Sequence, residues 1–155
     1  RFVEAVDCVP TMLDALALDP AEHVVEGRSL LALTRGTAGD WRDCVFSELD
    51  WTFRGARRRL GHPVGQHGAW MVRDARWKYV HWGSGHRPQL FDLAADPAEF
   101  FDLGAEASHE GVRQAMREKL LAWFAGLKRR TTMTWAEAEL GTDSHKRAGV
   151  FLGEW

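Results

Sequence analysis

The strongest constraint on the fold comes from residues 69–103, in which apolar and polar residues alternate in three short runs. The runs are rich in aromatic and β-branched residues, and a period of two in such residues is typical of half-buried antiparallel strands. The segments Asp74-Ala75-Arg76 and Gly83-Ser84-Gly85 separate the runs, and both are short enough for hairpin turns. Asp96-Pro97 then ends the predicted sheet, because proline has no N–H to donate to a ladder.

Two further segments complete the predicted fold. Residues 44–50 alternate in the same way and predict a fourth strand. Residues 108–130 predict the clearest helix, because their apolar residues recur at three- and four-residue steps and share one face. These apolar residues are Val112, Met116, Leu120, Trp123, Phe124 and Leu127. With Ser108 as the expected cap, the helix would pack its apolar face over the sheet. We therefore predict an α+β fold, with a small antiparallel sheet of about four strands packed by a long C-terminal helix.

The ends of the chain predict shorter helices. Asp7 is expected to cap a first helix whose apolar face is formed by Val9, Leu13 and Leu16 or Ala17. Thr134 begins a short helix up to Leu140, with Glu137 in the position of a capping-box partner. Residues 142–155 have no clear period, and their apolar residues are expected to dock on this chain or on another.

The composition is that of an ordinary globular domain, with 45% hydrophobic and 27% charged residues. A net charge of -2 gives no reason to expect nucleic acid or an acidic membrane as a partner. The sequence contains no apolar run long enough to span a bilayer. Its two cysteines, Cys8 and Cys44, are too few for a disulfide framework or a structural zinc site. Eight tryptophans favour an aromatic core around the sheet, with a pocket or interface lining as the alternative.

Four histidines raise the question of a metal site. The residues are His62, His67, His81 and His86. Neither an HExxH nor a CxxC motif accompanies them, and two loop histidines at five-residue spacing are a weak signal. We therefore predict no metal site in this chain.

Charged clusters provide the remaining candidates. Guanidinium groups at Arg54, Arg57, Arg58 and Arg59 match the oxygens of sulfate, phosphate or carboxylate, although a solvated helix face or loop is the simpler interpretation. Arg54 together with Trp51 is the candidate for a substrate-pocket wall. A second cluster is acidic and consists of Asp92, Asp96, Glu99 and Asp102. Turn formation and capping explain it more simply than paired acid–base catalysis, so no catalytic residue is assigned.

Two of these segments resemble a known family. The sequences MVRDARWKYV and QLFDLAADPAEFFDL resemble the C-terminal subdomain of sulfatase-type hydrolases in the alkaline phosphatase superfamily, with Phe91 in place of the usual Tyr and Asp102 in place of the usual Asn. The segments VDCVPTMLDAL, EGRSLL and VFSE extend the resemblance over most of the chain. Within the family, FSELDWTFRGARRRLG and HKRAGVFLGEW are most similar to phosphonate monoester hydrolases and the arylsulfatases near them.

The resemblance bears on Cys8. Sulfatases carry a Cys-x-Pro-x-Arg motif whose cysteine is oxidised to the nucleophilic formylglycine. Here Cys8-Val9-Pro10-Thr11 is followed by Met12 instead of Arg. The same residues match, position by position, a structural helix near the end of the family's catalytic domain. Cys8 is therefore expected to be structural.

The resemblance implies that the chain is the C-terminal part of a hydrolase of sulfate, phosphonate or phosphate monoesters, with a structural and pocket-wall role. Residues 1–40 would end the N-terminal catalytic α/β domain, residues 41–141 would form the C-terminal subdomain, and residues 142–155 would be a tail. The parent family uses a divalent cation and a formylglycine, and we expect neither in this chain. By itself the chain is expected to be inactive.

The implied partners are the rest of the parent catalytic domain and further copies of the full enzyme, with residues 150–155 as the candidate oligomer contact. Neither nucleic acid nor a membrane is expected as a partner. The localisation stays open, although unpaired cysteines are compatible with the cytoplasm. The alternative is a free-standing binding or interaction module with an aromatic sheet face.

Overall fold

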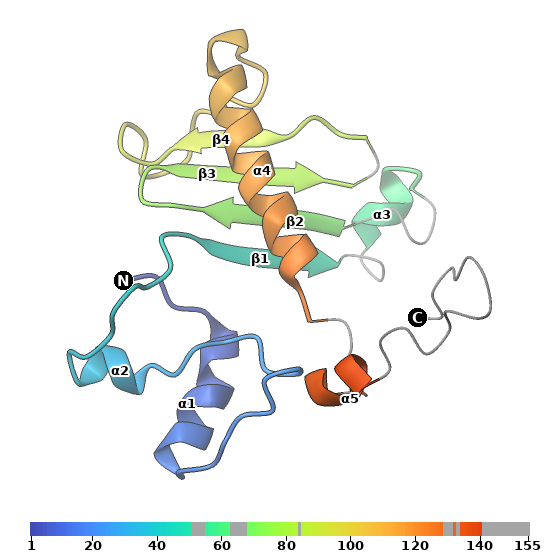
Figure 1. The fold of residues 1–155 in the computed structure, drawn as a ribbon. Helices are drawn as coiled ribbons and strands as arrows, with labels where there is room; N and C mark the ends of the chain where they lie inside the picture. Colours follow the sequence, from blue (N-terminus) through green and yellow to red (C-terminus); the bar gives the residue numbers. More distant parts are fainter. Residues whose placement is uncertain (51–54, 63–67, 84, 129–131, 133, 141–155) are drawn as a thin grey trace. The chain divides into compact units, whose positions relative to one another are not determined.

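The computed structural model describes residues 1–50, 55–62, 68–83, 85–128, 132 and 134–140 (Figure 1). The chain divides into two compact units. Residues 1–5 and 32–126 form the first unit, and residues 6–31 and 127–155 form the second. The three-part division expected from the sequence, with boundaries after residues 40 and 141, stays a prediction.

The first unit is built on a four-stranded antiparallel sheet. Its strands are β1 (Val45–Asp50), β2 (Gly68–Arg73), β3 (Trp77–Trp82) and β4 (Gln89–Asp92). They lie in the order β1-β2-β3-β4, so every neighbour in the sheet is also a neighbour in the sequence. The predicted small antiparallel sheet is confirmed, and its alternating residues place one side of each strand against the core.

One helix covers the sheet. The 3₁₀ turn η2 (Ala107–His109) leads into α4 (Glu110–Gly126), which runs across one face of all four strands (Figure 1). The predicted long helix is therefore confirmed. The expected cap at Ser108 is wrong, because Ser108 lies inside the preceding turn and its hydroxyl contacts His109 Nδ1 at 3.1 Å.

The core lies between α4 and a single row of strand residues. Phe46, Val72, Tyr79 and Leu90 are paired across the four strands in one register. Val72, Tyr79 and Leu90 are buried together with Met116 and Leu120 of α4. Burial of large apolar side chains on both elements is the main source of stability for a unit of this size.

An aromatic cluster closes one end of this core. Phe46 stacks on Trp123 with ring centroids 4.9 Å apart and an interplanar angle of 4°. Trp70 meets Phe124 edge to face at 5.7 Å. Offset stacks and edge contacts of this kind stabilise a core beyond the area that they bury. The aromatic-core interpretation holds for these residues.

Short helices make up the remaining described elements. They are η1 (Ala5–Asp7), α1 (Cys8–Ala15), α2 (Leu31–Thr34), α3 (Gly55–Arg59) and α5 (Trp135–Leu140). The predicted capping box of α5 is confirmed, since the Thr134 N–H donates to Glu137 Oε2 (2.7 Å) and the Glu137 N–H donates to Thr134 Oγ (3.2 Å). Of the residues predicted to form one apolar face at α1, Val9 and Leu16 are 49% and 69% exposed, and Leu13 is half-buried.

Asp7 has a different role from the one predicted. It makes no side-chain cap for α1. Instead its buried carboxylate accepts a hydrogen bond from the Arg28 N–H at 2.9 Å, while its carbonyl oxygen accepts one from Thr11 Oγ at 2.6 Å. The Thr11 hydroxyl in turn accepts from the Leu30 N–H. Asp7 therefore ties the start of α1 to a loop far along the chain.

The turn between β2 and β3 is held by one carboxylate. Asp74 Oδ1 accepts hydrogen bonds from the N–H groups of Arg76 (3.0 Å) and Trp77 (2.8 Å), and Asp74 Oδ2 accepts from Lys119 Nζ of α4 (2.8 Å). Burial by itself would raise the pKa of Asp74, but these three donors outweigh it and hold the pKa below its ordinary 3.8. The predicted short hairpin is confirmed here. Between β3 and β4 the connection is longer than the predicted break at residues 83–85, because β4 begins only at Gln89.

The contribution of Asp74 to stability is expected to depend on pH. Asp74→Asn keeps the turn acceptor and removes the ion pair with Lys119, so we expect it to lower the free energy of unfolding by about 1 kcal/mol at neutral pH. Because the folded-state pKa is depressed, the contribution is present above pH 3.8 and is lost as the pH falls through the lower folded-state pKa. Urea unfolding of both proteins across this range checks the effect. Asp19→Asn, at an exposed carboxylate, is the control. A variant gap that stays constant down to low pH would contradict this account.

Candidate functional site

The two residues predicted to form a pocket wall, Trp51 and Arg54, lie outside the described residues, as do His67 and the tail from residue 142. Their proposed roles therefore stay predictions. Among the neighbouring arginines, Arg58 and Arg59 are exposed on the short helix α3. Their exposure agrees with the simpler interpretation of a solvated helix face.

The carboxylate of Asp92 is held by hydrogen bonds from Arg76 and from the backbone. The Arg76 guanidinium donates to both carboxylate oxygens, with Nη2 2.8 Å from Oδ2. The N–H of Ala94 also donates to Oδ1 at 3.1 Å. The hydrogen bonds from Arg76 hold the pKa of Asp92 below its ordinary range, so this carboxylate stays ionised. It fixes the end of β4 and has no proton to give as an acid.

The other three acidic residues hold the loop after β4. Asp96 accepts the Phe101 N–H at 2.8 Å, and Glu99 pairs with Lys78 Nζ at 2.5 Å. Asp102 Oδ1 accepts the N–H groups of Leu90 and Gly104, while its Oδ2 pairs with Arg87 at 3.0 Å. All four carboxylates therefore bind local backbone or neighbouring cations. This arrangement agrees with the turn interpretation.

The structure separates the histidines into two places. His62 and His86 meet with their Nε2 atoms 2.8 Å apart, and the rings lie edge to face. His81 lies on β3, where its Nδ1 is 3.5 Å from the Tyr79 hydroxyl. Among the described residues, no group of three or more histidine, cysteine, aspartate or glutamate side chains could hold a metal ion.

The two cysteines lie in different surroundings. Cys8 is the first residue of α1 and is exposed. Cys44 is partly buried next to Asp43; burial and then this neighbour raise the pKa of its thiol to about 11. A thiol with so high a pKa stays protonated near neutral pH and is a poor nucleophile.

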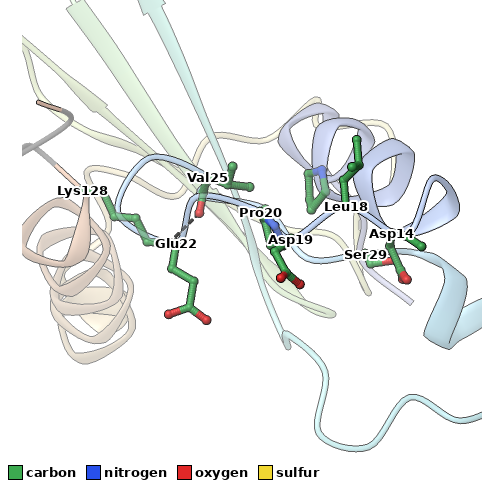
Figure 2. Close-up of a pocket in the computed structure, with 11 residues that line it drawn as sticks. Asp14, Leu18, Asp19, Pro20, Glu22, Val25, Ser29 and Lys128 are labelled. Carbon is green, nitrogen blue, oxygen red and sulfur yellow. Dashed lines mark hydrogen bonds between the residues drawn. The ribbon is translucent and has the colours of Figure 1, made fainter. Parts of the chain in front are cut away.

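A cavity of about 700 Å³ lies in the second unit beside α1 (Figure 2). Its wall includes Asp14, Asp19, Glu22 and Lys128 among apolar residues. Lys128 Nζ donates to the Val25 carbonyl oxygen, as the dashed line in Figure 2 marks, and Asp14 accepts the Ser29 hydroxyl. No histidine is found among its described lining residues.

A second cavity, of about 640 Å³, is a groove in the first unit along one flank of α4. Its lining includes Tyr79, Pro88, Gly104, Arg113, Gln114 and Arg117. Sequence reasoning did not single out these residues. The available signal was the pair of arginines at positions 113 and 117, which are one helical turn apart and therefore share a face.

No helix within the described ranges has the length and apolar character that crossing a membrane requires.

The first unit is thus a small antiparallel sheet with the helix α4 on one face and an acidic loop bound to local backbone. The chain belongs to the family described as N-sulphoglucosamine sulphohydrolase, C-terminal, whose family model matches residues 1–125. The resemblance carried by the two sequence segments is thereby confirmed. It favours the sulfatase-family hypothesis over the alternative of a free-standing binding module.

Relatives and solved structures agree with this assignment. The chain is 29% identical over 126 residues to the multifunctional alkaline phosphatase superfamily protein PehA of Trinickia caryophylli, and the matched region covers 79% of this chain and 24% of that protein. It is 32% identical over 111 residues to arylsulfatase K of Mus musculus, covering 67% of this chain and 18% of that protein. The phosphonate monoester hydrolase of Agrobacterium radiobacter superposes with a TM-score of 0.73 at 36% identity, covering 81% of this chain and 25% of that chain. The chain thus spans about a quarter or less of the length of these proteins.

Proposed function

We propose that this chain forms the C-terminal, structural part of a hydrolase of sulfate or phosphonate monoesters, in which the reacting groups belong to another region of the enzyme. The observation that carries the proposal is the family match over residues 1–125, which corresponds to the C-terminal region of such enzymes. The relatives include both arylsulfatases and phosphonate monoester hydrolases. We assign Trp51 and Arg54 to a wall of the substrate pocket on the basis of the sequence.

The parent family's cation and formylglycine do not fit the described residues. A divalent cation of this kind needs several oxygen or nitrogen ligands at one point, and no described group of three candidate ligands exists. Cys8 is followed at the fifth motif position by Met12 instead of Arg. We therefore derive no catalytic step from this chain and assign it a supporting role.

A direct assay tests the absence of catalysis. The purified chain, incubated with an aryl sulfate and with a phosphonate monoester in the presence and absence of added divalent cations, is expected to show no turnover above the buffer rate. Circular dichroism of the same sample checks that the chain is folded. Metal-dependent turnover by a folded chain would overturn the proposal.

A chimera tests the supporting role. The matching C-terminal quarter of the Agrobacterium radiobacter phosphonate monoester hydrolase is replaced by this chain, and hydrolysis of a phosphonate monoester is measured. We expect activity to be retained in the chimera and lost when the same quarter is deleted. A folded chimera that is as inactive as the deletion would contradict the role. A second, destabilised chimera carrying Leu90→Ala should lose activity at a lower temperature than the first.

We further propose that residues 150–155 contribute to contacts between copies of the full enzyme. The support is the apolar composition of this stretch, Val-Phe-Leu-Gly-Glu-Trp, at the end of a chain segment without clear periodicity. Deletion of residues 142–155 from the full enzyme is expected to lower its mass in solution, measured by light scattering. An unchanged mass would remove this partner assignment.

A further inference from the structure

The groove along α4 has a guanidinium and a phenol in its lining, and an imidazole lies next to the phenol. Arg117 lies on α4 and Tyr79 lies on β3, and both line the groove. The Tyr79 hydroxyl contacts His81 Nδ1 at 3.5 Å, so the imidazole continues this polar line. The Tyr79 side chain is otherwise buried in the core, which fixes the position of its hydroxyl.

Among the charged side chains that line the groove, only the guanidinium of Arg117 has donors free to bind a ligand, within the described residues. Arg113 is bound to the carbonyl oxygens of Leu103 and Glu106 and to the carboxylate of Glu110. Glu118 accepts the Gln114 amide at 3.1 Å. Within the part of the chain that the structure describes, Arg117 has no ion-pair or hydrogen-bond partner. Arg117 is thus the guanidinium in this groove whose donors are not already used.

Burial and the charge of Arg117 both act on the pKa values of His81 and Tyr79. Burial lowers the pKa of His81, and the charge of Arg117 lowers it further. Burial raises the pKa of Tyr79, against the lowering effects of Arg117 and Arg113, while Glu110 adds to the rise. Near neutral pH the site therefore combines one guanidinium with a neutral phenol and a neutral imidazole. Both neutral groups can donate a hydrogen bond.

We propose that this groove binds a small oxyanion between Arg117 and the Tyr79 hydroxyl, with His81 as the group that takes up a proton on binding. A guanidinium fork matches sulfate, phosphate and carboxylate oxygens. When the anion is bound, the Tyr79 O–H donates to it, and the protonated Nδ1 of His81 donates to the Tyr79 oxygen. The positive charge gained by His81 faces the anion as well as Arg117. Because Glu110 and Glu118 offset part of the positive charge, the site favours anions most strongly when His81 is protonated.

Proton uptake gives a readout that a merely structural arginine would not affect. The full chain with isotope-labelled histidine is titrated with acid, and the imidazole resonances are followed by NMR. Sodium sulfate, sodium phosphate and sodium acetate are compared in turn with sodium chloride at equal ionic strength. We expect the oxyanions to raise the pKa of His81 relative to chloride. The affinity for the anion should rise as the pH falls through the pKa of His81.

Matched variants assign the effect to its residues. Arg117→Gln, at an exposed helix position, is expected to lower the affinity for the anion by about tenfold. It should also abolish the anion-induced rise in the pKa of His81. Tyr79→Phe keeps the buried ring and removes the hydroxyl donor, so it is expected to lower the affinity for the anion by roughly threefold to tenfold. Arg35→Gln, at an exposed position outside the groove, should behave as the unmodified chain.

Two results would overturn the proposal. One is a His81 titration that is the same in sulfate, phosphate, acetate and chloride. The other is an anion response that survives in Arg117→Gln or disappears equally in Arg35→Gln. The three oxyanions also distinguish the chemistry, since a response to acetate identifies carboxylate recognition, whereas a response to sulfate or phosphate alone identifies a tetrahedral group. These outcomes do not depend on hydrolytic activity, so they are independent of the proposed function.

Discussion

Leu90→Ala is expected to lower the free energy of unfolding by about 2–5 kcal/mol, since it removes a side chain from the centre of the core. Leu90 has no exposed surface and lies in the register row of Tyr79, opposite Met116 and Leu120 of α4. The paired strand β3 and the helix α4 are both held in regular hydrogen-bonded structure, so they cannot close the space that the variant leaves. Urea unfolding followed by tryptophan fluorescence measures the change.

Leu121→Ala is the matched control. Leu121 lies on α4, but 53% of its surface is exposed, and alanine is the best helix former. We expect its effect to stay within about 0.5 kcal/mol. Equal losses in the two variants would show that the row between α4 and the sheet is not the core of the first unit.

Gly104→Ala is expected to cost about 1–3 kcal/mol or more, because the backbone around this residue has no room for a side chain. An added Cβ would lie 2.1 Å from the Pro88 carbonyl oxygen and 2.9 Å from the Gln89 Cα. Both are backbone atoms next to the start of β4, so the strand itself would have to move. The movement would also disturb the Gly104 N–H bond to Asp102. Thermal unfolding monitored by circular dichroism measures the loss.

Gly111→Ala makes the same chemical change with the opposite expected sign. Gly111 lies in the first turn of α4, and nothing stands within 4 Å of the position that its Cβ would take. Replacing a helical glycine by alanine is expected to be neutral or to stabilise by up to about 1 kcal/mol. Destabilisation by Gly111→Ala, or a neutral Gly104→Ala, would contradict the assignment of the tight backbone contact.

The strands and the long helix were predictable because each has one buried side. Alternation along β2 and β3 and the stripe from Val112 to Phe124 are direct records of that burial in the sequence. The family assignment was predictable for a related reason. Arg76 pairs with Asp92, and Asp102 accepts the Leu90 N–H of β4. The spacing of these motif residues in the sequence therefore follows from the fold.

The details that failed depend on competition between partners far apart in the sequence. Asp7 was expected to cap α1, but the Arg28 N–H binds its carboxylate instead. The groove beside α4 is lined by Tyr79, Pro88 and Gly104 as well as by helix residues, and no local pattern in the sequence encodes their approach. The predicted pocket residues Trp51 and Arg54 fall outside the described chain, so the sequence remains the basis for their role.

The bonds of Asp102 explain which substitutions its position accepts. One oxygen receives two backbone N–H groups, those of Leu90 and Gly104, and this is work that the amide oxygen of asparagine performs equally well. The second oxygen pairs with Arg87, whose side chain is 60% exposed and adds little stability. Relatives with asparagine at this position would therefore keep the loop intact and lose only a surface ion pair. In this fold the position requires an acceptor atom of the right reach, whereas the charge serves only the pair with Arg87.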